Sequence, residues 1–256
     1  MGVATAAFFD LDRTLLRRSS SLALAGSFRE RGLIGRLQLL RAALWQLLFV
    51  ARGAGAEAVR RAAEDGMVVL RGVEVEELRE LVAEAMEPVL KPLVYAEPLR
   101  LVERHRDAGE RVYVVSAALQ EIVDALVEEL AFDGGIGSIC ESVDGVYTGR
   151  AHRACHGAAK ADALRALARA DGIDLAGSTA YSDSHTDLPF LEAVGRPVAV
   201  NADRALRLVA AERGWPVLEF SELLYPRGRR RLPVAIGVPL VVGAGAAVWI
   251  ASRRAA

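Results

Sequence analysis

The sequence predicts an α/β protein built on a mostly parallel sheet. Strand-like apolar runs alternate with helix-like segments through much of the chain after residue 98. This alternation favours right-handed crossovers between parallel strands. Three of the apolar runs end in a polar residue, at Asp10, Ser116 and Asp183. Ligands bind at the carboxyl edge of open α/β sheets, so the three positions indicate one site.

The elements are expected in the following order. Residues 3–10 form a buried strand, and residues 17–95 have a helical pattern without a convincing strand. Helices are then expected near 98–108, 118–130, 157–170 and 187–194, and strands at 112–115, 179–182 and 197–201. Residues 139–150 are expected to form a hairpin, because Asp144-Gly145 is a two-residue turn signal.

The composition excludes some classes of protein. The 256 residues carry a formal net charge of −1, so the chain has no broad basic field for nucleic acid. Cys140 and Cys155 fit no zinc or redox spacing, which favours a reduced, cytoplasmic setting. No signal-peptide pattern precedes the first strand. Lys91 and Lys160 are the only lysines among 32 basic residues, which makes each position informative.

The C-terminal segment predicts a membrane anchor. Residues 232–252 contain no charged residue and no histidine, and a helix of this length would span about 30 Å, the thickness of a bilayer core. A basic linker at 226–231 precedes the segment. Because the heavier basic flank is N-terminal, we expect the folded domain on the cytoplasmic side. The alternative is a buried core helix, although one this long usually shows a polar face.

The first strand leads into two acids and a hydroxyl, Asp10, Asp12 and Thr14. Gathered carboxylates are costly unless a cation or a reaction requires them. Asp10 and Asp183 together could hold one Mg²⁺, which also prefers water and phosphate oxygens. Asp187 could support that shell, or could simply oppose the dipole at the start of a helix. These residues therefore predict a metal-assisted site.

The same residues suggest phosphoryl transfer through a carboxylate nucleophile. Such an attack requires charge neutralisation on the phosphoryl oxygens, which Ser116 and Lys160 would provide. Asp12 would protonate the leaving alcohol and then activate water. Thr14 is a candidate substrate-binding residue and is expected to fix the loop by hydrogen bonds rather than to react.

Four motifs stand in order along the chain: FFDLDRT at 8–14, VVSA at 114–117, Lys160, and YSDSHTD at 181–187. On these motifs the chain resembles the haloacid dehalogenase superfamily, and within it subfamily IB, the phosphoserine-phosphatase-like group. The resemblance implies a Rossmann-like core from residues 1–16 and 96–225, with a helical cap inserted at 17–95. The transmembrane helix at 232–252 would be added to this fold.

The resemblance also implies a role for each matching residue. Asp10 is similar to the nucleophile and Mg²⁺ ligand, and Asp12 to the acid/base whose backbone carbonyl binds the metal. Ser116 and Lys160 match the phosphate-binding residues, Asp183 the acidic metal ligand, and Asp187 its supporting acid.

Two positions depart from the family pattern. Arg13 replaces the usual glycine, and we expect its side chain to point outward rather than to contact phosphate or the cap. Ser19 stands where phosphoserine phosphatases carry a glutamate that reads the substrate's amino group, which argues against phosphoserine as the substrate.

The leading hypothesis is a Mg²⁺-dependent phosphomonoester hydrolase with an aspartyl-phosphate intermediate. The alternatives are a membrane-tethered module that binds a phospho-ligand without catalysis, and a phosphotransferase that passes the phosphoryl group to an alcohol. Residues 32–51 are apolar on nearly all helical faces, which fits a cap core or a lipid-contacting surface. The substrate could therefore be a lipid phosphomonoester or a small metabolite phosphate.

Overall fold

The computed structural model describes residues 4–33 and 67–225. Within these residues seven strands form one sheet in the order β4-β3-β2-β1-β5-β6-β7. The strands are β1 (Ala6–Phe9), β2 (Arg111–Leu119), β3 (Gly134–Val143), β4 (Val146–Arg153), β5 (Thr179–Ser182), β6 (Arg196–Val200) and β7 (Val217–Leu218). Every neighbouring pair is parallel except β3 and β4, which confirms the predicted α/β fold.

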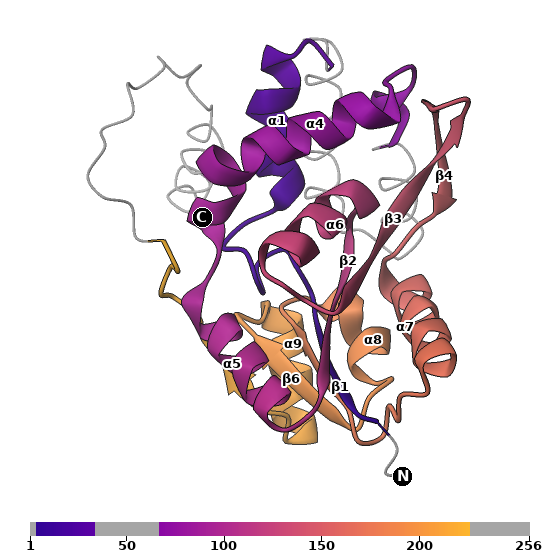
Figure 1. Ribbon diagram of the computed structural model, residues 1–256. Helices are drawn as coiled ribbons and strands as arrows, with labels where there is room; N and C mark the ends of the chain where they lie inside the picture. The colour runs from indigo at the N-terminus through magenta and orange to yellow at the C-terminus, as the bar shows by residue number, and fades with distance from the viewer. Residues whose placement is uncertain (1–3, 34–66, 226–256) are drawn as a thin grey trace, which may run out of the picture. The chain divides into compact units, whose positions relative to one another are not determined.

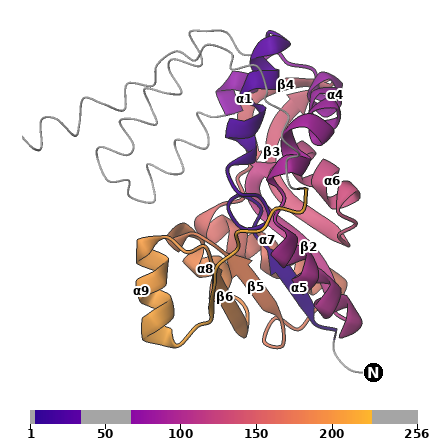
Figure 2. The same ribbon diagram turned by 90° about the vertical axis from the view of Figure 1, so that its left-hand side faces the viewer.

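Helices cover both faces of the sheet, as Figure 2 shows from the side. Alternate residues of β1 point to opposite faces. Ala6 and Phe8 pack in one buried cluster with helices α7 (Gly157–Asp171), α8 (Leu188–Leu191) and α9 (Arg204–Arg213). Ala7 and Phe9 pack in a second cluster with α5 (Ala96–Asp107) and α6 (Gln120–Glu129). Because β1 is buried on both faces, it reads as a continuous apolar run.

Most predicted elements lie within a few residues of their expected positions. The strand at 179–182 is confirmed without change, whereas β2 continues past its expected end at Val115 to Leu119. The helix expected near 187–194 is shorter, because a 3-10 turn (His185–Asp187) precedes the four residues of α8. Helix α9 and strand β7 were not predicted. Strand β7 forms the edge of the sheet opposite β4, and α9 packs in the same buried cluster as α7 and α8.

The predicted hairpin is confirmed. Asp144 and Gly145 have φ angles of 50° and 80°, the paired positive values of a tight two-residue hairpin turn. The tip of the hairpin is joined to the inserted segment by main-chain hydrogen bonds. Val75 N donates to Gly145 O at 2.8 Å, and Gly72 N donates to Tyr147 O at 2.9 Å. Figure 1 shows β3 and β4 reaching from the sheet toward α4.

The described parts of the inserted segment are helical, as expected. They contain α1 (Ser20–Glu30), a 3-10 turn (Val68–Leu70), α4 (Val75–Ala85), a π-helical turn (Met86–Leu90) and a second 3-10 turn (Lys91–Leu93). The boundaries of the cap at 17–95 stay a prediction. The segment at 32–51 lies almost wholly outside the described residues, so its role as cap core or lipid surface also stays a prediction.

Across residues 4–33 and 67–225, no helix combines the length and apolar character needed to cross a bilayer. The basic linker at 226–231 and the expected membrane helix at 232–252 lie outside the described residues.

Candidate active site

Strand register brings three of the predicted residues to one edge of the sheet. Phe9 of β1 lies opposite Val114 of β2 and Tyr181 of β5. By the same register Asp10 lies level with Val115 and Ser182, each one residue before Ser116 and Asp183. Asp10 N donates to Tyr181 O at 2.9 Å, which extends the ladder by one residue to Asp10. The edge is the carboxyl end of the parallel strands, as predicted.

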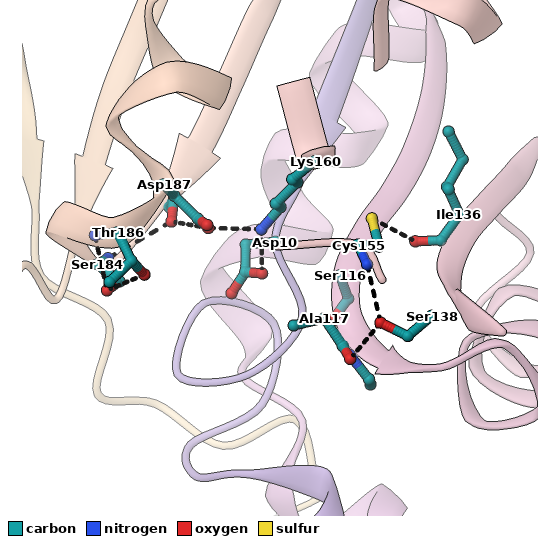
Figure 3. Close-up of polar contacts among 12 residues, drawn as sticks. Asp10, Ser116, Ala117, Ile136, Ser138, Cys155, Lys160, Ser184, Thr186 and Asp187 are labelled. Carbon is teal, nitrogen blue, oxygen red and sulfur yellow. Dashed lines mark hydrogen bonds and ion pairs between the residues drawn. The ribbon is translucent and has the colours of Figure 1, made fainter. Parts of the chain in front are cut away.

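Lys160 is the fourth residue of α7 and projects into this edge. Its Nζ lies 2.5 Å from Asp10 Oδ1 and 2.5 Å from Asp187 Oδ2. Figure 3 shows the ammonium between the two carboxylates. The Lys160 side chain is only 1% exposed, so the charge of its ammonium must be satisfied by groups within the protein. The predicted juxtaposition of Lys160 with Asp10 is confirmed.

The carboxylates at this edge have perturbed acidity. Burial raises the pKa of Asp10 to about 8, Lys160 opposes the rise, and Asp187 and Asp183 add to it. Burial also raises the pKa of Asp183 to about 6, with Arg13 opposing and Asp187 adding to the rise. Buried carboxylates that face one another favour protonation or a bound cation. A cation bound at this edge would favour the ionised forms of Asp10 and Asp183.

Asp12 and Thr14 follow in the loop after β1. Asp12 Oδ1 accepts a hydrogen bond of 2.8 Å from Ser20 N at the start of α1, which fixes the carboxylate. Burial raises the pKa of Asp12, and the bond from Ser20 opposes that rise. Thr14 is fully buried, yet its hydroxyl has no hydrogen-bond partner among the described residues. The expectation that the Thr14 hydroxyl fixes the loop is therefore not met.

A serine that the sequence reasoning missed connects the two segments that carry the predicted phosphate-binding residues. Ser138 Oγ donates to Ala117 O at 2.9 Å and accepts from Cys155 N at 3.0 Å. Ala117 directly follows Ser116, and Cys155 lies just before the helix that carries Lys160. Ser138 is almost fully buried, and Figure 3 shows it between the two segments. Ser116 is itself held by a bond from Ala118 N to its Oγ at 3.1 Å.

The loop after β5 is fixed by further residues outside the predicted set. Ser182 Oγ donates to Asp187 Oδ2 at 2.7 Å. Asp203 caps α9, and its second oxygen accepts from His185 N at 2.9 Å. Asp203 N also donates to Asp183 O at 2.8 Å. Ser182 borders a motif residue and Asp203 precedes a helix, so each had a local signal.

Arg13 does not simply point outward, contrary to expectation. Its Nε lies 3.2 Å from Asp183 Oδ2, although 55% of the side chain is exposed. The reason is the backbone, because Arg13 has a φ of 64° in the left-handed region. Sequence alone gives no measure of this conformation for a residue other than glycine.

The chemistry of this edge fits Mg²⁺. No three carboxylate, thiol or imidazole side chains within the described residues converge closely enough to form a metal cage. Mg²⁺ is usually held by one or two carboxylates with water and substrate oxygens rather than by such a cage. Asp10 and Asp183 would supply the carboxylates, and the predicted carbonyl of Asp12 a neutral oxygen. Asp187 is already bonded to Lys160 and Ser182, so its contribution to the metal shell stays a prediction.

Charge balance supports the same fit. The carboxylates of Asp10, Asp12, Asp183 and Asp187 face the cations Lys160 and Arg13. When all are ionised, an excess of two negative charges remains, which one divalent cation would balance. The arrangement thus gathers carboxylates of raised pKa, a buried ammonium and a hydroxyl at one edge.

Comparisons with known proteins agree on one family. A family model for haloacid dehalogenase-like hydrolases matches residues 7–192. An inhibition of morphological differentiation protein from Streptomyces azureus is 40% identical over 98% of the chain and 95% of its own length. A phosphoserine phosphatase from Mycobacterium tuberculosis is 36% identical over 98% of the chain and 82% of its own length.

Among solved structures, a protein of unknown function from Bordetella pertussis Tohama I has a TM-score of 0.76 at 29% identity. The match covers 85% of the chain and 99% of that protein.

Proposed function

The chain belongs to the haloacid dehalogenase-like hydrolase family, and on that premise we propose that it is a Mg²⁺-dependent phosphomonoester phosphatase. The observation that carries the proposal is the buried contact of Lys160 with Asp10 beside Asp12 and Asp183. A buried ammonium against a carboxylate nucleophile suits a reaction that brings a phosphoryl dianion to that carboxylate.

In this proposal Asp10 attacks phosphorus and the bond from phosphorus to the alcohol oxygen breaks. Asp12 donates its proton to the departing alkoxide, which its raised pKa favours. Asp12 then takes a proton from water as that water attacks the aspartyl phosphate, and inorganic phosphate leaves. Lys160 and Ser116 hold the phosphoryl oxygens throughout. Bound Mg²⁺ would neutralise phosphoryl charge and orient the group.

The mechanism is tested by substituting each aspartate of the first motif. Asp10→Asn is expected to abolish both turnover and the acid-labile phosphoenzyme. Asp12→Asn is expected to trap the phosphoenzyme or release phosphate very slowly. Asp162→Asn is a suitable control, because that carboxylate is exposed on α7. Normal turnover by Asp10→Asn would exclude the mechanism.

Two alternatives are separated by the products. A non-catalytic binding module would release no phosphate from p-nitrophenyl phosphate with Mg²⁺ or from a panel of amino-acid, sugar and lipid phosphates. The intact set of acids argues against this alternative. A phosphotransferase would instead yield a new phosphate ester when an alcohol is added.

We also propose that residues 232–252 anchor the protein in the membrane with the catalytic domain on the cytoplasmic side. The support is the uncharged run between basic flanks. Such an anchor would bring the site near lipid phosphomonoesters, while small metabolite phosphates stay accessible. Extraction of membranes at high pH without detergent is the test. Release of the full-length chain into the soluble fraction would exclude the anchor.

A further inference from the structure

Arg13 occupies a backbone conformation that glycine adopts without strain and arginine does not. Its φ is 64°, and Asn201 Nδ2 donates to its carbonyl at 3.3 Å. Residues held in this region carry conformational strain, and such strain concentrates at functional sites.

The site contains a second cation, but that cation is already committed. Lys160 is buried and bonded to both Asp10 and Asp187. Arg13 differs, because it contacts Asp183 through Nε while over half of its side chain reaches solvent. Among the described residues, none accepts a hydrogen bond from its two terminal nitrogens. Those nitrogens form a planar fork suited to a carboxylate or phosphate.

The segment that begins at Arg13 favours an anion. Residues 13–20 contain three arginines and no acid, and all three are exposed. Ser19 serves as the N-cap of α1, with its Oγ accepting from Leu22 N at 3.5 Å. An ammonium group on a substrate would therefore meet no carboxylate from residues 13–20.

From these contacts we propose that Arg13 determines specificity by binding a second anionic group of the substrate. This inference rests on the proposed phosphatase function. The reacting phosphoryl group lies on Asp10 and Lys160, and a nearby carboxylate or phosphodiester of the same molecule pairs with the free fork of Arg13. The substrate class is thus a phosphomonoester that carries another anion a short distance from the phosphorus.

Equilibrium binding tests the proposal without requiring turnover. The full-length Asp10→Asn protein with Mg²⁺ is titrated calorimetrically with 3-phosphoglycerate, which has the second anion. Glycerol 3-phosphate lacks the anion, and O-phosphoethanolamine replaces it with an ammonium. We expect 3-phosphoglycerate to bind about tenfold or more tightly than the other two, as for a charge-assisted pair. Adding Arg13→Gln should remove the preference, and Arg13→Lys should keep part of it.

Arg18→Gln is the matched control, because it removes the same charge from the same exposed loop. It should leave the binding preference intact. Equal affinity of the Arg13-containing protein for all three ligands would overturn the proposal. So would an Arg13→Gln variant that weakens all three ligands by the same factor, since Arg13 would then act only through Asp183.

Two separate experiments identify the source of the second anion and test the proposed phosphatase function. Phosphatidylglycerol phosphate and phosphatidate in detergent micelles repeat the comparison for lipids. A larger preference in the lipid pair than in the soluble pair would assign the anion to a lipid headgroup, and the reverse would assign it to a soluble metabolite. Hydrolysis of p-nitrophenyl phosphate by protein with Asp10 intact tests the phosphatase function. If the protein does not hydrolyse p-nitrophenyl phosphate, the binding preference can still be measured.

Discussion

Lys160 Nζ and Asp10 Oδ1 lie 2.5 Å apart although 150 positions separate the two residues in the chain. Burial would lower the pKa of Lys160, but Asp10 and Asp187 raise it above its usual range. The ammonium therefore stays charged within the protein. One buried cation thus joins the first strand, α7 and the loop after β5.

Replacing Lys160 with methionine should remove both activity and much stability. Breaking a buried ion pair leaves uncompensated charge and costs about 3–5 kcal/mol. Urea unfolding would measure this loss. The double variant Lys160→Met/Asp187→Asn should regain part of the stability and no activity. Lys91→Met is the control, because Lys91 pairs with Glu87 and Glu129 away from the site. Equal losses from the two single lysine variants would contradict the buried-pair account.

Ser138→Ala should lower kcat by about tenfold with a smaller change in KM. The substitution leaves the carbonyl of Ala117 without its donor, at a stability cost of about 1–3 kcal/mol. Without the Ser138 bridge, the segments that carry Ser116 and Lys160 are both held in place less precisely. Ser138→Thr retains the hydroxyl and should restore most of kcat. Ser142→Ala alters an exposed serine of the same strand and serves as control. Kinetics of Ser138→Ala matching this control would show that the bridge is dispensable.

Mg²⁺ should raise the thermal stability of the protein, and a chelator should reverse the rise. A ligand at 100 times its Kd stabilises a fold by about 2.7 kcal/mol. Asp183→Asn should reduce the Mg²⁺-dependent shift in Tm, whereas Asp162→Asn should not. Differential scanning calorimetry with and without metal would measure the effect. If the Asp183→Asn variant still showed the full Mg²⁺-dependent shift in Tm, Asp183 would not be a metal ligand.

Glu110 should make folding stability depend on pH. Thr5 Oγ1 donates to its carboxylate at 3.0 Å, and His105 and Arg196 also contact it. Burial would raise the pKa of Glu110, but these partners lower it below the ordinary value of 4.5. The ionised group therefore stabilises the fold fully above about pH 4.5. This stabilisation is lost as pH falls through the lowered pKa of Glu110 in the folded protein.

The comparison of wild type with Glu110→Gln measures this contribution. We expect a difference in unfolding free energy of about 1–3 kcal/mol at neutral pH, shrinking below about pH 4. Glu103→Gln alters an exposed residue of α5 and should show no such trend. A difference that grew on acidification would have the wrong sign for this mechanism.

Local patterns predicted the strands and the edge residues because both depend on short-range signals. An apolar run that stops at Asp10 or Asp183 is visible in the sequence, and the scarcity of lysine made Lys160 informative. Ser138 gave no such signal, because a serine within a strand is unremarkable until the fold brings Ala117 and Cys155 to it. The contact of Arg13 depended on a positive φ, which tertiary structure imposes.

Strand β3 has two partners along its length. Tyr113 to Val115 of β2 pair with its first residues, and β4 pairs with its last ones. Its far end is tied through the hairpin tip to Val75, and Ser138 lies at the changeover between partners. At this changeover Ser138 bonds to Ala117 after Ser116 and to Cys155 before α7. A single hydroxyl thus joins the strand that reaches the inserted segment to both segments that carry the predicted phosphate-binding residues.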